Sequence, residues 1–402
     1  MNHQMSGDRA VEPVGWRRRA LLGGGVLVAC AGAMGAWRAV GTGMVLQGDE
    51  AFRAWEAWAT MPAGDPLSLV AAAVLASSPH NTQPWAFRVA RDSIEVLADE
   101  SRALGAMDPF ARELWHGLGA AIANIEVAAP ARGFQAETVL RPPGSEGRVA
   151  ARIRLRPAPV ELTPLAAAID KRSTNRAAYA PERAVSEALQ ASLSAADDHH
   201  TRVVWLQANS PAGKHFARAT IAATQQISAD VEMSEAGHHW FRANPKEVAR
   251  HRDGISTATA GIAPWVATLS PLLPPVDGPT AGEYWLESTR MQLASAPLYG
   301  LVAVRDLYDR PTQLLAGARW QRMHLALTAE GLAAHPLNQL MELVDRDRQL
   351  ARPSPTAALL AELSGDALWK PSFAFRMGYA TRAVPRSARR SLAAVVSPGR
   401  AG

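Results

Sequence analysis

Apolar residues fall at helical spacing shortly after the first sixty residues. Between Leu67 and Leu75 they stand at positions 67, 69, 70, 73, 74 and 75, a spacing that one helix can bury. Pro66 stands near the start of this run, where a helix tolerates proline. The pattern predicts a helix that begins near Asp65 and leads directly into a polar loop at residues 77–85.

Alternating segments follow that loop. Apolar and polar residues alternate across residues 87–89 and 94–97, with the polar triplet Arg91–Ser93 between them, which predicts a β-hairpin. A long apolar helix is expected at about Glu113–Ala131. Gly133 closes it, because glycine is common just beyond a helix C-terminus.

Part of this pattern recurs later in the chain. Residues 119–134 align without gaps to residues 317–332, and both stretches are small-residue-rich helices that end in a glycine and an apolar residue. A short predicted strand follows each, at residues 152–155 and 373–377. The order of elements favours an ancestral duplication over a coincidence between two alanine-rich helices.

A proline-rich stretch at residues 263–279 separates the two repeats. Pro271, Pro274 and Pro275 are expected to preclude a regular helix or a central strand there. Long structured loops often cover active sites, so we expect residues 240–279 to form a lid, with an ordinary surface excursion as the alternative.

Composition limits the classes of protein that the chain can be. With 402 residues, 48% of them hydrophobic and 20% charged, the chain can bury one or two cores. The net charge of +5 is not gathered into a basic run with interleaved aromatics, so no nucleic-acid binding is expected. Cys30 is the single cysteine, which excludes a disulfide framework and a thiolate-rich metal site. No metal site is expected from the histidine pairs His199–His200 and His238–His239 either, because adjacent residues on a helix or strand do not converge on one metal ion.

Residues 1–40 have the pattern of a targeting segment. Arg17, Arg18 and Arg19 precede a weakly apolar, glycine-rich run, as in twin-arginine export signals. The run at residues 20–36 could be retained as an anchor, cleaved after small residues, or lipidated at Cys30. Each alternative places the body of the protein in the periplasm or on the outer face of the cytoplasmic membrane.

Two polar motifs carry the candidate chemistry. Ser77–Trp85 contains S-x-x-N-x-Q-P-W, and Arg172–Arg176 reads R-S-T-N-R. On an extended segment Arg172, Thr174 and Arg176 face the same way, and two guanidinium groups with a hydroxyl make a good phosphate cradle. The first motif resembles the flavin-contacting loop of FMN-dependent nitroreductases, and the second resembles their flavin-binding strip.

The resemblance implies a set of FMN-binding residues. In the loop, Ser78, Asn81 and Gln83 would present polar groups to the flavin. His80 occupies a variable position, where we expect a structural or solvent-facing role, with proton donation to a substrate as the alternative. In the strip, the resemblance assigns Arg172 and Thr174 to the phosphate end of FMN. It assigns Arg176 to N1 and the C2 carbonyl of the ring.

Two later segments complete the implied site. The backbone of Pro336, Leu337 and Asn338 would lie against the isoalloxazine ring, with the N–H near Asn338 approaching flavin N5. The family usually has an acidic residue and glycine at this point, and this chain departs from that pattern. Arg389 or Arg390 would provide a C-terminal phosphate contact.

The loop precedes the strip here, in the reverse of the usual family order. This order indicates two nitroreductase-like halves, at residues 41–160 and 161–402, fused into a pseudo-dimer with one flavin site. The implied fold is therefore the α+β nitroreductase fold. The exported, Acg-like branch of the superfamily is the one that the chain resembles most.

The resemblance implies two-electron transfer through flavin N5 to a flat acceptor such as a nitroaromatic or a quinone. The flavin carries this chemistry, so no catalytic side chain is expected. Nicotinamide cofactors are scarce outside the cytoplasm, so a membrane partner could be the electron donor. The alternative is an FMN-binding or FMN-sequestering protein without turnover. The chain is expected to be a monomer that contacts membrane only through its N-terminal segment.

Overall fold

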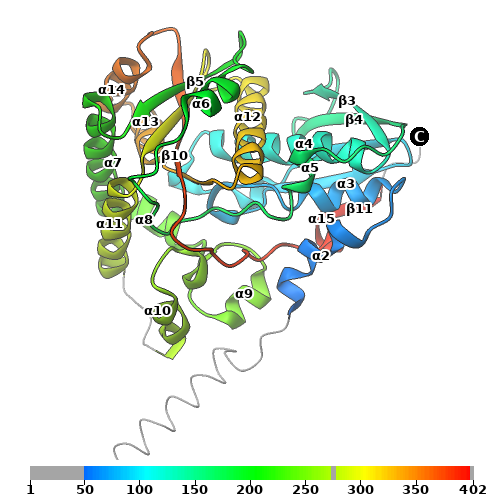
Figure 1. The fold of residues 1–402 in the computed structure, drawn as a ribbon, viewed down its shortest axis with the longest axis horizontal. Helices are drawn as coiled ribbons and strands as arrows, with labels where there is room; N and C mark the ends of the chain where they lie inside the picture. Colours follow the sequence, from blue (N-terminus) through cyan, green and yellow to red (C-terminus); the bar gives the residue numbers. More distant parts are fainter. Residues whose placement is uncertain (1–48, 273–277, 399–402) are drawn as a thin grey trace, which may run out of the picture.

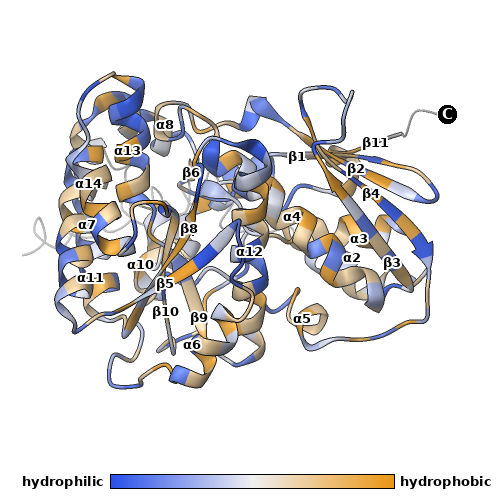
Figure 2. Ribbon diagram, turned by 90° about the horizontal axis from the view of Figure 1, so that it is seen from above, coloured by the Kyte–Doolittle hydropathy of each residue, from blue (hydrophilic) through white to orange (hydrophobic). Residues whose placement is uncertain are grey.

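The computed structural model describes residues 49–272 and 278–398, so the predicted targeting segment at residues 1–40 lies outside the described residues. The fold is mixed α+β, with two main sheets on either side of a central pair of long helices (Figures 1 and 2). Within the described residues, no helix is both long and apolar enough to cross a membrane.

The first sheet has five strands in the order β11-β1-β2-β4-β3. Its neighbours are antiparallel except β11, which runs parallel to β1 and brings the C-terminal end of the chain onto this sheet. The strands are β1 (Trp85–Val89), β2 (Ser93–Ala98), β3 (Phe134–Leu140), β4 (Val149–Pro157) and β11 (Val396–Pro398).

The second sheet has four antiparallel strands in the order β5-β8-β10-β9. This order matches β1-β2-β4-β3 of the first sheet, strand for strand along the chain. The strands are β5 (Thr201–Gln207), β8 (Leu298–Val304), β9 (Ala333–Pro336) and β10 (Lys370–Gly378).

A long helix occupies the same position in the strand order of each sheet. Helix α4 (Arg112–Ala131) connects the second and third strands of the first sheet, and α12 (Arg310–Ala329) connects their counterparts in the second. The two helices pack directly against each other between the sheets (Figure 2). Their alanines and glycines permit this close approach, since small side chains bring helix axes nearer together.

Shorter helices surround this framework, and many begin with a serine, threonine, asparagine or aspartate cap followed by proline. They are α2 (Arg53–Thr60), α3 (Pro66–Ala73), α5 (Pro164–Ala167), α6 (Glu187–Ser194), α7 (Pro211–Ala229), α8 (Val231–His238), α9 (Pro245–His251), α10 (Pro264–Leu269), α11 (Gly278–Ala294), α13 (Gln339–Gln349), α14 (Pro355–Ser364) and α15 (Leu392–Val395). A small parallel pair, β6 (Phe241–Arg242) and β7 (Ile255–Ser256), lies between α8 and α10.

The elements predicted for the first half are confirmed. Helix α3 begins after Asp65, whose carboxylate accepts the Leu67 N–H at 2.9 Å. Strands β1 and β2 form the expected hairpin, and residues 152–155 lie within β4. Helix α4 ends where Gly133 adopts a φ of +75°, a conformation that glycine takes without strain.

One expectation about the proline-rich stretch is wrong. We expected no regular helix in residues 263–279, yet α10 begins at Pro264 and α11 at Gly278. Pro264 is the first helical residue, where its missing N–H would have no partner within the helix. Residues 273–277 of the expected lid lie outside the described residues.

Candidate functional site

The loop that precedes β1 has an unusual backbone. His80, Asn81 and Gln83 all adopt positive φ, at 45°, 56° and 53°. Such conformations cost on the order of 1–3 kcal/mol each in non-glycine residues and persist only where the surroundings enforce them. Ser78 Oγ accepts the Gln83 N–H at 3.0 Å, and the fully buried Trp85 anchors the end of the loop.

Two distant segments hold this loop from outside. Asn81 Nδ2 donates to the carbonyl of Gly254 and to that of Ala388, each at 3.1 Å. Gln83 Nε2 donates to the Arg252 carbonyl at 2.8 Å. The excursion at residues 240–272 and the C-terminal segment thus meet over the loop.

The strip at residues 172–176 extends the second sheet beside β9. Thr174 forms a parallel bridge with Ala334. Arg176 is half-buried and its Nη1 donates to the Thr259 carbonyl at 3.1 Å. Burial lowers the pKa of Arg176 to about 10, which leaves it protonated at neutral pH.

Arg172 and Arg389 form a pair of buried cations. Arg172 is 2% exposed and Arg389 is 3% exposed. Arg172 Nη2 donates to the Leu75 carbonyl at 3.1 Å, while its Nε and Nη1 have no hydrogen-bond partner. Arg389 Nη1 donates to Asn81 Oδ1 at 2.6 Å, and its Nε also lacks a partner.

The electrostatics show that these two guanidinium groups are close and uncompensated. Burial, and then the positive charge of Arg172, hold the pKa of Arg389 well below its usual range. Burial alone lowers the pKa of Arg172 to about 10. No carboxylate from residues 49–272 or 278–398 forms an ion pair with either group. A site with two buried cations and unsatisfied donors fits an anionic ligand such as a phosphate ester.

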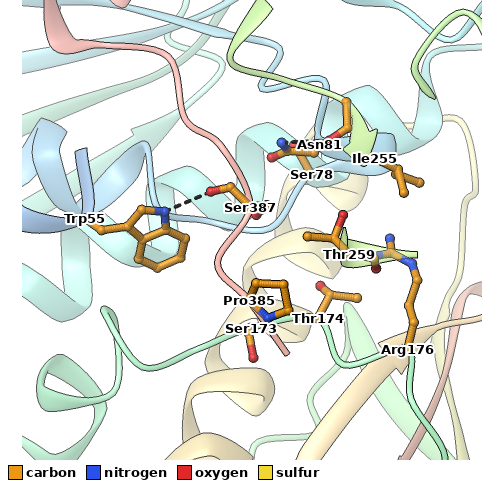
Figure 3. A pocket seen from close by; sticks show the side chains of 11 residues that line it. Trp55, Ser78, Asn81, Ser173, Thr174, Arg176, Ile255, Thr259, Pro385 and Ser387 are labelled. Carbon is orange, nitrogen blue, oxygen red and sulfur yellow. Dashed lines mark hydrogen bonds between the residues drawn. The ribbon is translucent and has the colours of Figure 1, made fainter. Parts of the chain in front are cut away.

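A cavity of about 470 Å³, counting space open to solvent, lies between the loop, the strip and the C-terminal segment (Figure 3). Polar side chains from both halves of the chain point into it. Its lining residues are Trp55, Ser78, Asn81, Ser173, Thr174, Arg176, Gly254, Ile255, Thr259, Pro385 and Ser387.

The structure brings most of the sequence-predicted residues together. Ser78, Asn81, Thr174 and Arg176 line the cavity directly. Gln83, in the same loop, is fully buried and does not line the cavity. Arg172 and Arg389, the remaining predicted cations with unsatisfied nitrogens, are not among the lining residues. Arg389 contacts Asn81 in the loop, and Arg172 contacts Leu75, two residues before the loop begins.

Other predicted residues lie elsewhere. Pro336, Leu337 and Asn338 do not line the cavity, and Asn338 Oδ1 instead accepts the Ala374 N–H at 2.9 Å. Arg390 forms an ion pair with Asp99 at 3.4 Å and donates to the Gln83 carbonyl at 3.2 Å, so its side chain braces the loop.

Several lining residues carry no signal in the sequence. Trp55 of α2 donates from Nε1 to the Ser387 carbonyl at 2.9 Å (Figure 3). The centre of its ring lies 4.9 Å from the guanidinium carbon of Arg389. The helical spacing of Trp55 marks it only as a core residue. Gly254, Ile255 and Thr259 belong to the segment expected to form a lid, but no local pattern singles out these three residues as lining the cavity.

The imidazole of His80, in the loop, is uncharged at neutral pH. It is half-buried, and desolvation followed by the positive charge of Arg176 lowers its pKa to about 4. The imidazole is therefore neutral at pH 7 and adds no further charge to the arginines. Within the described residues, no group of three or more histidine, cysteine, aspartate or glutamate side chains could hold a metal ion.

Comparison with known proteins gives partial matches. No family model matches the chain. Two proteins of Mycobacterium tuberculosis, from strains H37Rv and CDC 1551 and both named "Putative NAD(P)H nitroreductase", are 38% identical to it over 109 residues. The match spans 27% of this chain and 32% of the length of those relatives.

Among solved structures, a nitroreductase with bound FMN from Desulfitobacterium hafniense gives a TM-score of 0.35 at 12% identity, covering 57% of this chain and 96% of that one. The FMN-dependent nitroreductase NfnB from Mycobacterium smegmatis, in complex with NADPH, gives 0.35 at 16% identity, covering 58% and 96%. The sequence similarity of this chain is thus to proteins named as nitroreductases, over about a quarter of its length.

Proposed function

We propose that this chain is a nitroreductase-like flavoprotein that binds one FMN in the cavity between the loop at residues 77–85 and the strip at residues 172–176. The observation that carries the proposal is the pair Arg172 and Arg389. Both are buried, both have guanidinium nitrogens without partners, and neither has a carboxylate beside it. A phosphate ester supplies the negative charge and the acceptor oxygens that such a pair lacks.

The residues fit distinct parts of the cofactor. Arg172 and Arg389 would hold the phosphate, while Thr174 and Ser78 offer hydroxyl groups along the cavity wall. Arg176 would place a positive charge near the ring, where it favours a reduced, anionic flavin. Bound FMN would itself supply two-electron transfer, and we assign no catalytic side chain.

The acceptor that we propose is a flat molecule such as a nitroaromatic or a quinone. The support is the name of the similar Mycobacterium tuberculosis proteins and the apolar side chains of Ile255 and Trp55 in the cavity wall. The excursion at residues 240–272 would act as the lid, because Gly254 and Thr259 contact the loop and the strip. It would exclude water from the ring.

We also propose that the chain consists of two fused halves that share this single site, as in the Acg-like branch. The matching strand orders of the two sheets support this, as does the origin of the loop and the strip in different halves. Export by the twin-arginine route, with a body outside the cytoplasm and a membrane electron donor, rests on the sequence of residues 1–40 alone.

The visible absorption spectrum of the purified protein tests the proposal. A flavin band at one FMN per chain, released as FMN on denaturation, is the expected result. Added NAD(P)H and a nitroaromatic would then separate an enzyme, which oxidises the nicotinamide faster with the acceptor present, from an FMN-sequestering protein, which does not. A colourless protein that fails to take up added FMN would overturn the proposed function.

A further inference from the structure

Helix α10 is an apolar helix with no buried side chain. The stretch from residue 262 to residue 272 contains no charged residue. Trp265 is 69% exposed and Leu269 is 47% exposed, and their i, i+4 spacing places them on one side of the helix. An exposed tryptophan and leucine on one uncharged helix are typical of a surface that binds a membrane or another protein.

Helix α9, in the same excursion, is basic on its exposed side. Lys246, Arg250 and His251 are exposed, and the one carboxylate of the helix, on Glu247, is engaged at its N-terminus by the Ala243 N–H at 2.9 Å and by Asn244. We refer to Lys246, Arg250, His251, Trp265 and Leu269 as the α9–α10 face. Its charge is therefore positive.

This face lies at the end of the molecule where the described chain begins. Helix α9 packs on the 3-10 turn at Asp49–Phe52, and Arg252 forms an ion pair with Glu50 at 3.0 Å. Figure 1 shows α9 and α10 together at this end. The 48 residues that precede Asp49 include the uncharged apolar run at residues 20–36.

We propose that the α9–α10 face docks on an anionic lipid bilayer. Aromatic and aliphatic side chains beside lysine and arginine are the combination that binds at the interface of such a membrane. Tryptophan in particular prefers the headgroup level. A second copy of the chain fits the face less well, because an isologous contact would bring two copies of the same positively charged surface together.

Docking would also connect the membrane with the cavity, since Gly254, Ile255 and Thr259 belong to the same excursion. The docking itself does not depend on the proposed cofactor. It is therefore tested by a lipid readout that works with or without flavin.

A fluorescent label on α10 in the full-length chain tests the proposal. Cys30→Ser removes the native cysteine, and Thr268→Cys then places an environment-sensitive dye on α10 beside Trp265 and Leu269. The matched control places the same dye at Leu368→Cys, which is 66% exposed in the connection between α14 and β10, far from α10 in Figure 1. Vesicles of phosphatidylcholine with phosphatidylglycerol, and of phosphatidylcholine alone, are then added.

The expected result is a blue shift at position 268, and none at position 368, with the anionic vesicles. Lys246→Glu with Arg250→Glu should raise the lipid concentration needed for this shift at least about tenfold, because each basic residue near an anionic surface contributes attraction. Trp265→Ser should reduce the shift without changing the charge.

Three results would overturn the proposal. The first is no shift at position 268 while the protein floats with the vesicles, held by its N-terminal segment alone. The second is an equal shift with phosphatidylcholine vesicles. The third is a blue shift at position 268 without vesicles. If this shift grows with protein concentration, the α9–α10 face binds a second copy of the chain. If the shift does not depend on protein concentration, the face binds the chain's own N-terminal segment.

Discussion

Gly119 of α4 and Gly317 of α12 make reciprocal contacts at the crossing of the two long helices. A Cβ built on Gly119 would lie 2.0 Å from the carbonyl oxygen of Leu314, and one built on Gly317 would lie 2.0 Å from that of His116. Leu314 precedes Gly317 by three residues, just as His116 precedes Gly119. Under the alignment of residues 119–134 with 317–332, Leu314 is the counterpart of His116, so each glycine meets the residue that corresponds to the one three positions before itself. This reciprocity is the pattern of an isologous contact.

Replacing either glycine with alanine should strongly destabilise the protein. A methyl group cannot fit 2.0 Å from a backbone oxygen, so the helices must separate. Overpacking of this kind costs roughly 1–3 kcal/mol or more. Denaturant unfolding of Gly119→Ala and Gly317→Ala measures this loss of unfolding free energy.

Gly237 supplies the control for that experiment. It lies within α8, and a Cβ there would have no atom within 4 Å. Gly237→Ala should leave stability unchanged or raise it by up to about 1 kcal/mol, because alanine favours the helix. If all three variants unfold alike, the close crossing of α4 and α12 is not what stabilises the fold.

The sequence predicted the two helices but not their crossing. The gapless alignment of residues 119–134 with 317–332 identified two equivalent helices, because small residues and a terminal glycine are local features. The pairing of β11 with β1 could not be predicted, since Val396–Pro398 joins a strand more than three hundred residues away. Such pairings depend on the whole topology rather than on periodicity.

The sequence also predicted only part of the candidate site. Ser78, Asn81 and Arg176 were identified because their motifs are specific, and they line one cavity. The sequence left Arg389 and Arg390 equivalent, since adjacent arginines look alike until their partners are known. The structure distinguishes them, because only Arg390 has a carboxylate partner, Asp99.

A buried carboxyl group should make stability depend on pH. Burial, opposed by Arg112 and reinforced by Asp108 and Asp345, raises the pKa of Glu113 to about 8. In the unfolded chain the glutamate has its ordinary pKa of 4.5, so the native state holds more protons than the unfolded state between pH 4.5 and pH 8. The contribution of Glu113 to stability should therefore fall as pH rises from about 5 to about 8.

Glu113→Gln isolates this effect, because an amide resembles the protonated carboxyl at every pH. Unfolding free energies at pH 5, 6.5 and 8 should show the variant gaining on the wild type as pH rises. Glu137→Gln is the control, since Glu137 is exposed on β3 and paired with Arg156. A constant difference between Glu113→Gln and wild type across this range would contradict the prediction.

Asp253 should stabilise the position of residues 240–272 over the cavity. Its carboxylate accepts from Arg242 Nη2 at 2.6 Å and also from Arg102, which in turn donates to the Thr82 carbonyl in the loop. Asp253→Asn should cost roughly 3 kcal/mol of local stability, because it leaves two partly buried cations without their partner. Hydrogen exchange of amides 240–262 should accelerate.

Asp366→Asn is the matched control for Asp253→Asn. Asp366 forms an ion pair with Arg202 at 3.6 Å, and that pair is more exposed to solvent. Such pairs contribute little, so exchange in residues 240–262 should stay unchanged. Equal exchange in the two variants would show that the excursion is held by other contacts, such as that between Asn81 and Gly254.

Substitutions of the adjacent residues Arg389 and Arg390 should differ in their effect on FMN affinity. Arg389→Gln removes one of the two buried cations that face no carboxylate, so FMN should bind at least about tenfold more weakly, since a charged hydrogen bond contributes roughly 1.5–3 kcal/mol. Arg390→Gln should keep FMN affinity within about threefold of wild type, because its side chain pairs with Asp99 and donates to the main-chain carbonyl of Gln83. The backbone N–H of residue 390, which binds the Gln83 side chain, is kept in the variant.

Titration of the apo-proteins with FMN, followed by flavin fluorescence, measures both affinities. A thermal unfolding curve for each variant separates lost binding from lost folding. Arg389 should affect FMN affinity even where the fold is intact, whereas Arg390 should affect stability first. If Arg390→Gln weakens FMN binding as much as Arg389→Gln at equal stability, the phosphate does not lie between Arg172 and Arg389, and the cofactor must bind in a different orientation.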